Sequence, residues 1–390
     1  MTSGAAPAGT LLAMTDPRLL WVPGVDEHRT RLARLSRRLR AAGLDAVVIA
    51  PGADLRFCLG RTQGSHERFT GLVVRAAGDP FLLVPRLESP GWAGSPAEQI
   101  VDVLTWADGE DPYLVIAGRL GAGARVGVDD YMPSMHVHGL GEALGSAVVP
   151  GGPVIRDLRM AKTADELEAL HGVGEAIDRV HARVGEWLRP GRTEAQIGAD
   201  IAAAIVEEGH CCADFVIVGS GPNGASPHHE QSDRIVRAGD PVVIDIGGPA
   251  PSGYFSDSTR TYVCGEPTDP EFERVWRIVR DAQRAGIAAA RAGQPCSGVD
   301  AAARAVITDA GYGEYFITRT GHGIGMEVHE HPYMVRGYDT ALAPGMAFSV
   351  EPGIYLPGRF GVRIEDIVAI GGDGGPVLCN HSPQDWRLPA

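Results

Sequence analysis

The sequence predicts an α+β protein of two domains, in which a smaller α/β domain precedes a larger α+β domain. Helix-like and strand-like patterns alternate between residues 25 and 155, as they do in α/β domains. Residues 156–390 instead contain two helices followed by strands, twice in succession. Residues 1–24 are rich in Ala, Gly and Pro, show neither pattern, and are expected to form a disordered tail.

The first domain is expected to begin with an amphipathic helix over residues 26–42, where leucines recur every three to four residues. Gly43 ends this helix, because glycine readily adopts the left-handed conformation of a helix C-terminus. Short apolar runs bounded by turn residues predict the strands that follow. These strands are expected over residues 45–50, 70–76, 80–85, 124–129 and 147–152, the second and third forming a hairpin.

The second domain begins with a long amphipathic pattern over residues 160–190. Thr163 lies three residues before Glu166, which is the spacing of a capping box. Thr193 begins a second helix that ends at Gly209. A further helix pair is expected over residues 270–292 and 298–310, and strands are expected over residues 215–221, 240–248, 253–265, 315–320, 346–351 and 362–370.

Charge and cysteine content narrow the functional classes. The net charge of −14 argues against nucleic acid or an anionic membrane as a partner, and a small peptide or a divalent cation fits it better. No run of 18 apolar residues predicts a membrane span, and the first residues lack the pattern of a signal peptide. The six cysteines are scattered without Cys-x-x-Cys spacing, which favours reduced thiols and a cytoplasmic protein.

Two aspartates interrupt apolar strands of the second domain. Asp245 lies in VVIDIGG, and Asp257 follows twelve residues later in YFSDSTRTYV. A carboxylate in such a strand is costly to bury unless it is paired or bound to a metal. Adjacent antiparallel strands lie about 4.8 Å apart, so both carboxylates can reach one ion or one pair of ions. Alternatively, Asp257 is an edge-strand charge paired with Arg260.

Two glutamates show the same pattern near the C-terminus. Glu351 follows the apolar run MAFSV, and Glu365 lies in GVRIEDIVAI two residues after Arg363. A buried ion pair between Arg363 and Glu365 is the simpler interpretation of the second motif. Four carboxylates in strands built from Val, Ile and Phe are nevertheless unusual, because an unpaired charge is costly in an apolar environment.

The stretch GHGIGMEVHEHP, residues 321–332, is too polar for a buried strand and too rich in glycine for a helix. Its His322 adds one nitrogen to the four carboxylates, a ligand set that suits Mn²⁺, Co²⁺ or Zn²⁺. Five protein ligands are too many for one catalytic ion with an open position, and they suit two ions roughly 3.5–4 Å apart. The glycines around His322 are expected to let the backbone approach the metals.

The motifs DIGG…GYFSDSTRT, GHGIGMEVHEHP, SVEPGIY and GVRIED, in this order, resemble those of the pita-bread metallopeptidases. This family includes methionine aminopeptidase, aminopeptidase P and prolidase (Xaa-Pro dipeptidase). The resemblance covers residues 155–380 and implies a C-terminal pita-bread catalytic domain preceded by a creatinase-type N-terminal domain. The chain length is most similar to that of bacterial Xaa-Pro dipeptidases.

The resemblance implies a role for each of the five ligand-type residues. Asp245 corresponds to the terminal ligand of one ion, and His322 and Glu351 correspond to ligands of the other. Asp257 and Glu365 correspond to the carboxylates that bridge the two ions. The two aspartates are one residue further apart here than in the usual family pattern, and the extra residue falls in the turn GGPAPSG.

Further residues resemble family members' substrate-binding and supporting groups. His329, seven residues after the metal histidine, and His228 resemble the histidines that donate hydrogen bonds to the scissile carbonyl. Without the resemblance, His228 is an exposed loop histidine beside a second one. Arg363 and Tyr355 resemble a pair that orients metal-binding carboxylates. His331 departs from the family pattern and is expected to face solvent or, failing that, the substrate.

The function implied is hydrolysis of the peptide bond before proline, with Xaa-Pro dipeptides as substrates. Two divalent ions, expected to be Mn²⁺ with Co²⁺ or Zn²⁺ as alternatives, would supply a metal-bridging hydroxide. Glu351 is expected to take the proton of the water and deliver it to the proline nitrogen. Some prolidases grip the substrate carboxylate with an arginine where this chain has Tyr333, and Arg336 is the nearest substitute.

Other functions stay open at this point. Without a carboxylate-binding arginine, the chain is also compatible with an aminopeptidase P that cleaves longer Xaa-Pro peptides. A metal-independent creatinase or a non-catalytic binding protein shares the fold, but neither needs all five ligand types. The resemblance further implies a homodimer, in which residues 56–68 of one chain would close the site of its partner.

Overall fold

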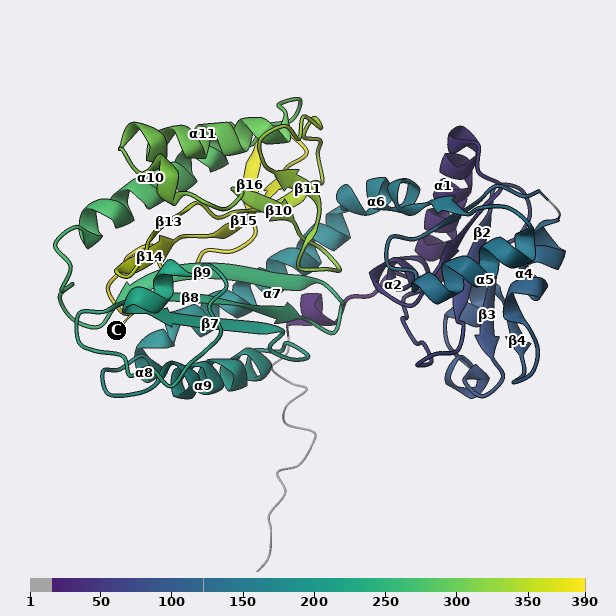
Figure 1. The fold of residues 1–390 in the computed structure, drawn as a ribbon, viewed down its shortest axis with the longest axis horizontal. Helices are drawn as coiled ribbons and strands as arrows, with labels where there is room; N and C mark the ends of the chain where they lie inside the picture. The colour runs from purple at the N-terminus through teal and green to yellow at the C-terminus, as the bar shows by residue number, and fades with distance from the viewer. Residues whose placement is uncertain (1–15, 122, 390) are drawn as a thin grey trace, which may run out of the picture. The chain divides into compact units, whose positions relative to one another are not determined.

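The structure is a computed structural model that describes residues 16–121 and 123–389 (Figure 1). It contains two compact units, one formed by residues 22–159 and the other by the segment up to Trp21 together with the residues from Met160 onward. Most of the tail predicted over residues 1–24 lies outside the described residues. Its described part is folded instead, because Pro17–Leu20 form a 3-10 helix and Leu19 is buried.

The first unit contains a six-stranded mixed sheet in the order β4-β3-β2-β1-β5-β6. The predicted hairpin is confirmed, since the second strand pairs antiparallel with the third. The edge strand β4 was not predicted, because the exposed Asp102 and Thr105 interrupt its apolar residues. The strands are β1 (Ala46–Ile49), β2 (Gly71–Arg75), β3 (Phe81–Pro85), β4 (Asp102–Trp106), β5 (Val126–Val128) and β6 (Val149–Pro150).

Helices pack on this sheet and complete its core. Ile116 and Leu140 pack against strand residues such as Val48 and Val73. The predicted first helix is confirmed, and it ends at Gly43 with a positive φ of 65°, as expected for a glycine cap. The helices are α1 (Val25–Ala42), α2 (Ala53–Leu59), α3 (Ala97–Ile100), α4 (Pro112–Leu120), α5 (Ser134–Leu144) and α6 (Gly152–Met160).

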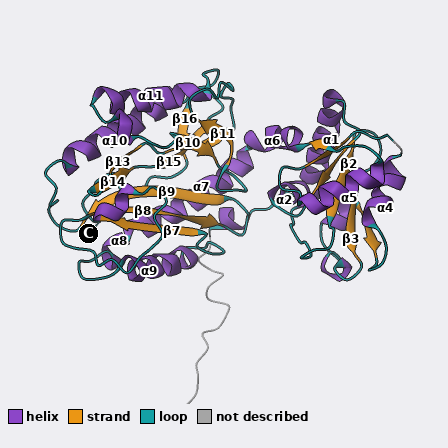
Figure 2. Cartoon of the chain, viewed as in Figure 1, coloured by secondary structure: helices purple, strands orange, loops and turns teal. Residues whose placement is uncertain are grey.

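The second unit places its strands between two groups of helices, as the ribbon colouring of Figure 2 shows. One group is α7 (Ala164–Ala182), α8 (Val184–Trp187) and α9 (Glu194–Glu207), and the other is α10 (Phe272–Ala289) and α11 (Cys296–Asp309). Both predicted capping residues, Thr163 and Thr193, form complete capping boxes. The predicted order of helices, strands, helices and strands is confirmed, but the single helix expected over residues 160–190 is divided into α7 and α8.

The strands of this unit form three small sheets. An antiparallel sheet has the order β7-β8-β9, a five-stranded sheet has the order β11-β10-β12-β15-β16, and β13 pairs with β14. The strands are β7 (Phe215–Ser220), β8 (Pro241–Pro249), β9 (Phe255–Val263), β10 (Gly321–Gly323), β11 (Glu330–Met334), β12 (Ala347–Val350), β13 (Gly353–Leu356), β14 (Phe360–Arg363), β15 (Asp366–Ile370) and β16 (Pro376–Leu378).

Three local predictions for this unit were wrong. The strand expected over residues 315–320 is absent from this described segment, because a 3-10 helix at Gly313–Tyr315 precedes β10. The single strand expected over residues 362–370 is two strands, since Glu365 leaves the ladder and its backbone N–H instead donates to Thr259. Residues 321–332 do form strands at both ends, where Lys162 donates to the buried Glu330 side chain and the His322 backbone N–H donates to the Ser349 hydroxyl.

Two glycines of the stretch 321–332 lie against neighbouring backbone. A Cβ at Gly321 would lie 1.9 Å from the Ser349 carbonyl oxygen, and one at Gly323 would lie 2.3 Å from that of His331. These glycines therefore allow neighbouring backbone to approach, and their expected role beside the metals stays a prediction.

No helix in the described part of the chain is both long and apolar enough to cross a membrane. Cys58, Cys264, Cys296 and Cys379 are buried, whereas Cys211 and Cys212 are exposed.

Candidate metal centre

The two aspartates lie on the same face of adjacent antiparallel strands. In the ladder of β8 and β9, Asp245 pairs with Thr259 and Asp257 pairs with Gly247, so the carboxylates are diagonal neighbours. On β8 the flanking Ile244 and Ile246 pack into the apolar core. Because side chains alternate along a strand, Asp245 faces the opposite side.

Asp257 is not an edge charge paired with Arg260, the alternative left open by its sequence. Its side chain is buried, and Arg260 instead forms a 2.6 Å salt bridge with Asp366. The arginine also donates to the Glu365 carbonyl and fixes the break between β14 and β15. Asp257 is therefore free to face the other carboxylates.

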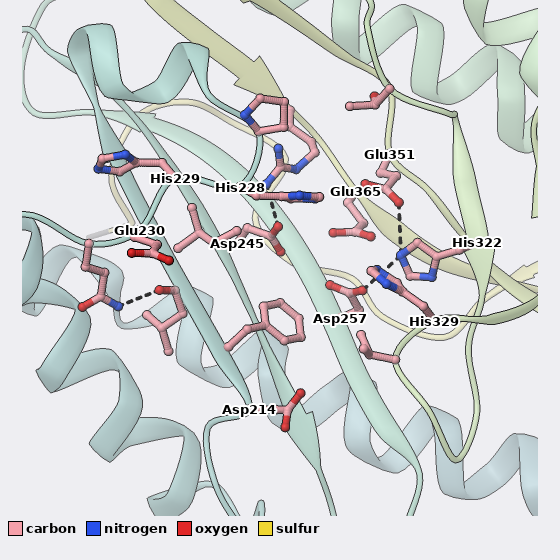
Figure 3. Close-up of a pocket in the computed structure, with 18 of the residues that line it drawn as sticks. Asp214, His228, His229, Glu230, Asp245, Asp257, His322, His329, Glu351 and Glu365 are labelled. Carbon is pink, nitrogen blue, oxygen red and sulfur yellow. Dashed lines mark hydrogen bonds and ion pairs between the residues drawn. The ribbon is translucent and has the colours of Figure 1, made fainter. Parts of the chain in front are cut away.

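His322 and the two glutamates reach the same place from three other segments (Figure 3). The Nε2 atom of His322, on β10, lies 3.1 Å from Glu351 Oε1 and 3.5 Å from Asp257 Oδ2. Its Nδ1 lies 3.1 Å from the Gly323 carbonyl oxygen, which can only accept a hydrogen bond. Nδ1 must therefore carry a proton, and Nε2 is directed at the carboxylates.

The arrangement fits a divalent metal. One ligand atom each from Asp257, His322 and Glu365 lie within 4.8 Å of one another. Asp245 Oδ1 is buried and has no hydrogen-bond partner. A buried acceptor without a donor is costly, and a cation at this position would remove that cost.

The electrostatics of the cluster point the same way. Burial, followed by repulsion from neighbouring carboxylates, raises the pKa of Asp257 and of Glu365 well above the ordinary range. Burial also raises the pKa of Glu351, but the hydrogen bonds with His322 and Ser349 and the charges of His322 and Arg363 together outweigh burial and lower that pKa to about 2. A bound cation would offset the repulsion at Asp257 and Glu365 and favour the charged forms of both carboxyl groups.

Arg363 donates a hydrogen bond to one of the carboxylates. Its Nη2 donates to Asp245 Oδ2 at 2.6 Å, and its Nη1 donates to the Tyr355 hydroxyl at 2.9 Å. The partner of Arg363 is thus Asp245, and the simpler interpretation of an ion pair with Glu365 is wrong. Arg363 thus links Tyr355 to the Asp245 carboxylate, and the expected role of this pair in orienting metal-binding carboxylates stays a prediction.

The cluster forms one wall of a cavity of about 580 Å³. His329 and His228 line the same cavity, and the His329 ring lies edge-on to that of His322 with 4.1 Å between centroids. Partial burial and then the charge of His322 lower the pKa of His329 to about 4, so its imidazole is neutral near pH 7. The cavity is lined by Asp214, Phe215, Val216, Ile217, Pro227, His228, His229, Glu230, Gln231, Asp245, Asp257, Thr318, His322, Val328, His329, Glu351, Tyr355, Arg363 and Glu365.

Two candidate residues lie elsewhere. Arg336 is exposed and lines a separate hollow with residues of α11 and the segment around Asp339. His331 is half-buried, and its Nδ1 lies 2.9 Å from the Tyr338 hydroxyl. His331 lies on β11, and Arg336 follows the end of that strand at Met334.

Several supporting residues were missed in the sequence. The Thr259 hydroxyl donates to Glu365 Oε2 at 2.7 Å, and the Ser349 hydroxyl donates to Glu351 Oε1 at 3.0 Å. A buried ion pair between Lys162 and Glu330, with an N–O distance of 2.6 Å, anchors the strand that follows His329. Only the polarity of these residues within apolar runs could have drawn attention to them.

Comparison with known proteins identifies both units. Residues 168–371 match the model of metallopeptidase family M24, and residues 31–161 match the creatinase/prolidase N-terminal domain. The chain is 52% identical over 360 residues to the probable dipeptidase PepE of Mycobacterium tuberculosis, covering 92% of this chain and 96% of that protein. It is 37% identical over 376 residues to the Xaa-Pro dipeptidase of Lactobacillus delbrueckii subsp. lactis, covering 92% and 99%.

A solved structure supports the same assignment. The crystal structure of dipeptidase PepE from Mycobacterium ulcerans matches with a TM-score of 0.91 and 49% identity, covering 95% of this chain and all of the other. The predicted fold, a pita-bread domain after a smaller α/β domain, is thereby confirmed. The chain belongs to metallopeptidase family M24, whose members use divalent metals, and it carries a creatinase/prolidase N-terminal domain.

Proposed function

We propose that this metallopeptidase hydrolyses the bond before proline in Xaa-Pro dipeptides with the help of two divalent ions. The observation that carries the proposal is the convergence of Asp245, Asp257, His322, Glu351 and Glu365 on one wall of a cavity that His228 and His329 also line. A relative of 37% identity that bears the name Xaa-Pro dipeptidase supports the choice of substrate.

The four carboxylates and one imidazole suit Mn²⁺, with Co²⁺ or Zn²⁺ as alternatives. Asp245 would hold one ion, His322 and Glu351 the other, and Asp257 and Glu365 both. When bound, the two ions would lower the pKa of a water molecule and polarise the substrate carbonyl.

Glu351 carries the proton in this proposal. Its Oε1 lies in the cavity wall beside His322, and its low pKa keeps it deprotonated at neutral pH. It accepts the proton of the attacking water and delivers it to the proline nitrogen, which leaves poorly unless protonated. His329, neutral near pH 7, and His228 donate hydrogen bonds to the oxygen of the scissile carbonyl as negative charge develops there.

One observation favours the alternative, an aminopeptidase P that cleaves longer peptides. Among the described residues that line the cavity, the sole lysine or arginine is Arg363. Asp245, Tyr355 and Thr259 already occupy its guanidinium group. In an Xaa-Pro dipeptide, proline carries the free carboxylate, which needs a cationic partner at that position. In a longer peptide the same carbonyl group forms a peptide bond and needs no cation.

Proline release from Ala-Pro and cleavage of Ala-Pro-Ala by chelator-stripped protein, titrated with Mn²⁺, tests the proposal. We expect Mn²⁺-dependent cleavage with preference for Ala-Pro. Preference for Ala-Pro-Ala would establish the alternative, and no cleavage of either peptide at any Mn²⁺ concentration would contradict both.

A further inference from the structure

The loop that carries His228 is not held in place by apolar packing. It connects β7 to β8, and residues Pro227 to Gln231 line the cavity. Between Pro222 and Ile235, all within the described residues, no apolar side chain is buried. A loop without buried apolar side chains takes its position from hydrogen bonds.

Glu194, the first residue of α9, supplies most of these bonds. Its carboxylate is fully buried, and the N-terminus of a helix stabilises its negative charge. Burial raises the pKa of Glu194, but the hydrogen bonds donated by Ser220 and Ser232 outweigh burial and lower it. The donors are Ser220 N (2.7 Å) and Oγ (2.6 Å), Asn223 Nδ2 (3.1 Å to each oxygen), His229 Nε2 (2.8 Å), and Ser232 Oγ (2.6 Å) and N (3.3 Å).

These contacts bear directly on His228, because His229 is its neighbour. Figure 3 shows the two rings pointing in opposite directions, that of His228 toward Asp245 and Glu365 and that of His229 away from them. Anchoring His229 on Glu194 therefore sets the direction of His228. Gln231 adds a second attachment, since its Nε2 donates to the Val216 carbonyl at 2.6 Å.

We propose that Glu194 is a positioning residue for His228, acting through His229 and Ser232. The inference rests on the proposed function, in which His228 donates to the substrate carbonyl. Burying a carboxylate costs desolvation free energy, so a need for stability alone does not explain why a carboxylate holds this loop. Seven hydrogen-bond contacts that converge on it fix the loop geometry, and a misplacement of about 1 Å can cost a peptidase roughly a hundredfold in rate.

A double-mutant cycle on the Mn²⁺-loaded protein tests this role. Glu194→Gln keeps the shape of the side chain but removes its charge, and we expect kcat for Ala-Pro to fall about tenfold to a hundredfold. His228→Ala should lower kcat about a hundredfold or more. Glu207→Gln, on the exposed end of the same helix, is the matched control and should retain wild-type kcat.

The double variant Glu194→Gln/His228→Ala decides between positioning and general damage. If Glu194 acts through His228, the double variant is no slower than His228→Ala within about twofold, because coupled residues are not additive. Losses that multiply in the double variant, or a wild-type kcat for Glu194→Gln, would overturn the proposal. If Glu194→Gln does not fold, Ser232→Ala, which removes one donor, takes its place in the cycle.

Hydrogen–deuterium exchange separates this inference from the proposed function. If the wild-type protein cleaves neither peptide, the proposed function fails, but the loop can still be examined. We then expect residues 220–232 to exchange faster in Glu194→Gln than in Glu207→Gln. Equal exchange in the two variants would overturn the positioning role.

Discussion

Four carboxylates share one wall of the cavity, yet their surroundings give them different properties. Asp245 is held by Arg363 at 2.6 Å, and Glu351 by His322 at 3.1 Å. Asp257 and Glu365 lack a salt bridge to an arginine or lysine among the described residues, and their pKa values lie well above the ordinary range. An arginine or histidine within 3.1 Å thus serves two of the carboxylates, and a bound cation would offset the repulsion that raises the pKa of the other two.

Replacing Glu351 tests its part in proton transfer. Because Glu351→Gln cannot accept a proton and also weakens a metal ligand, we expect kcat for Ala-Pro to fall by about 10³-fold or more. Proline release at saturating Mn²⁺ measures the effect, with the exposed Glu314→Gln as a control. Near-normal turnover by Glu351→Gln would remove its assigned role.

Replacing Thr259 tests how the carboxylates are oriented. Thr259→Val keeps the shape but removes the hydroxyl that donates to Glu365 and accepts from Arg363. We expect Mn²⁺ affinity, measured by isothermal titration calorimetry, to fall about tenfold to a hundredfold. Thr268→Val, at an exposed position, should leave it unchanged; equal affinities for both variants would show that Thr259 has no such role.

At the residue scale, the carboxylates of the candidate metal centre could be found in the sequence, but the residues that hydrogen-bond to them could not. Asp245 and Asp257 interrupt apolar strands, and Glu351 and Glu365 adjoin apolar strands, where a carboxylate is costly without a partner. Threonine and serine occur in strands for many ordinary reasons, so the sequence did not show that Thr259 and Ser349 contact the carboxylates. Arg336 was a plausible carboxylate partner by proximity in sequence, but it follows the end of β11 and lines a separate hollow.

Among the elements, the helices with capping boxes were the most predictable. Thr163 and Thr193 each combine a side-chain acceptor with Glu or Gln three residues later, a local signal that needs no tertiary contact. The break between β14 and β15 was not predictable, because Arg260 and Thr259, more than a hundred residues away, cause it.

The cap of α7 gives a stability test at this scale. Thr163→Ala removes the hydroxyl that accepts from Glu166 N, and we expect a loss of about 1 kcal/mol in the free energy of unfolding. A lower melting temperature with unchanged kcat would report this loss. Thr308→Ala, at an exposed position within α11, serves as the control; equal melting temperatures for the two variants would contradict the assignment.

For the whole molecule, alternation of helices and strands revealed the two domains, but strand order did not follow from it. Neighbouring strands such as β12 and β15 are joined only by long-range pairing. Such pairing depends on which faces meet in the folded chain, and a single sequence does not record it.

The raised pKa values of Asp257 and Glu365 predict how pH acts on the whole molecule. In the metal-free protein, these carboxyl groups bind protons more tightly in the folded state than in the unfolded state. Their contribution to the free energy of unfolding is therefore lost as pH rises above their unfolded pKa of about 4. Mn²⁺ must displace the same protons, so its affinity rises with pH. We expect the increase in melting temperature on adding Mn²⁺ to be larger at pH 8 than at pH 6. An equal or smaller increase at pH 8 would contradict this account.

The most direct test of the two-metal claim is to count the ions that activity requires. Chelator-stripped protein is titrated with Mn²⁺ while bound metal per chain and proline release from Ala-Pro are measured in the same samples. The account predicts that activity reaches its plateau at two bound ions per chain. A plateau at one ion, or full activity in the stripped protein, would contradict it.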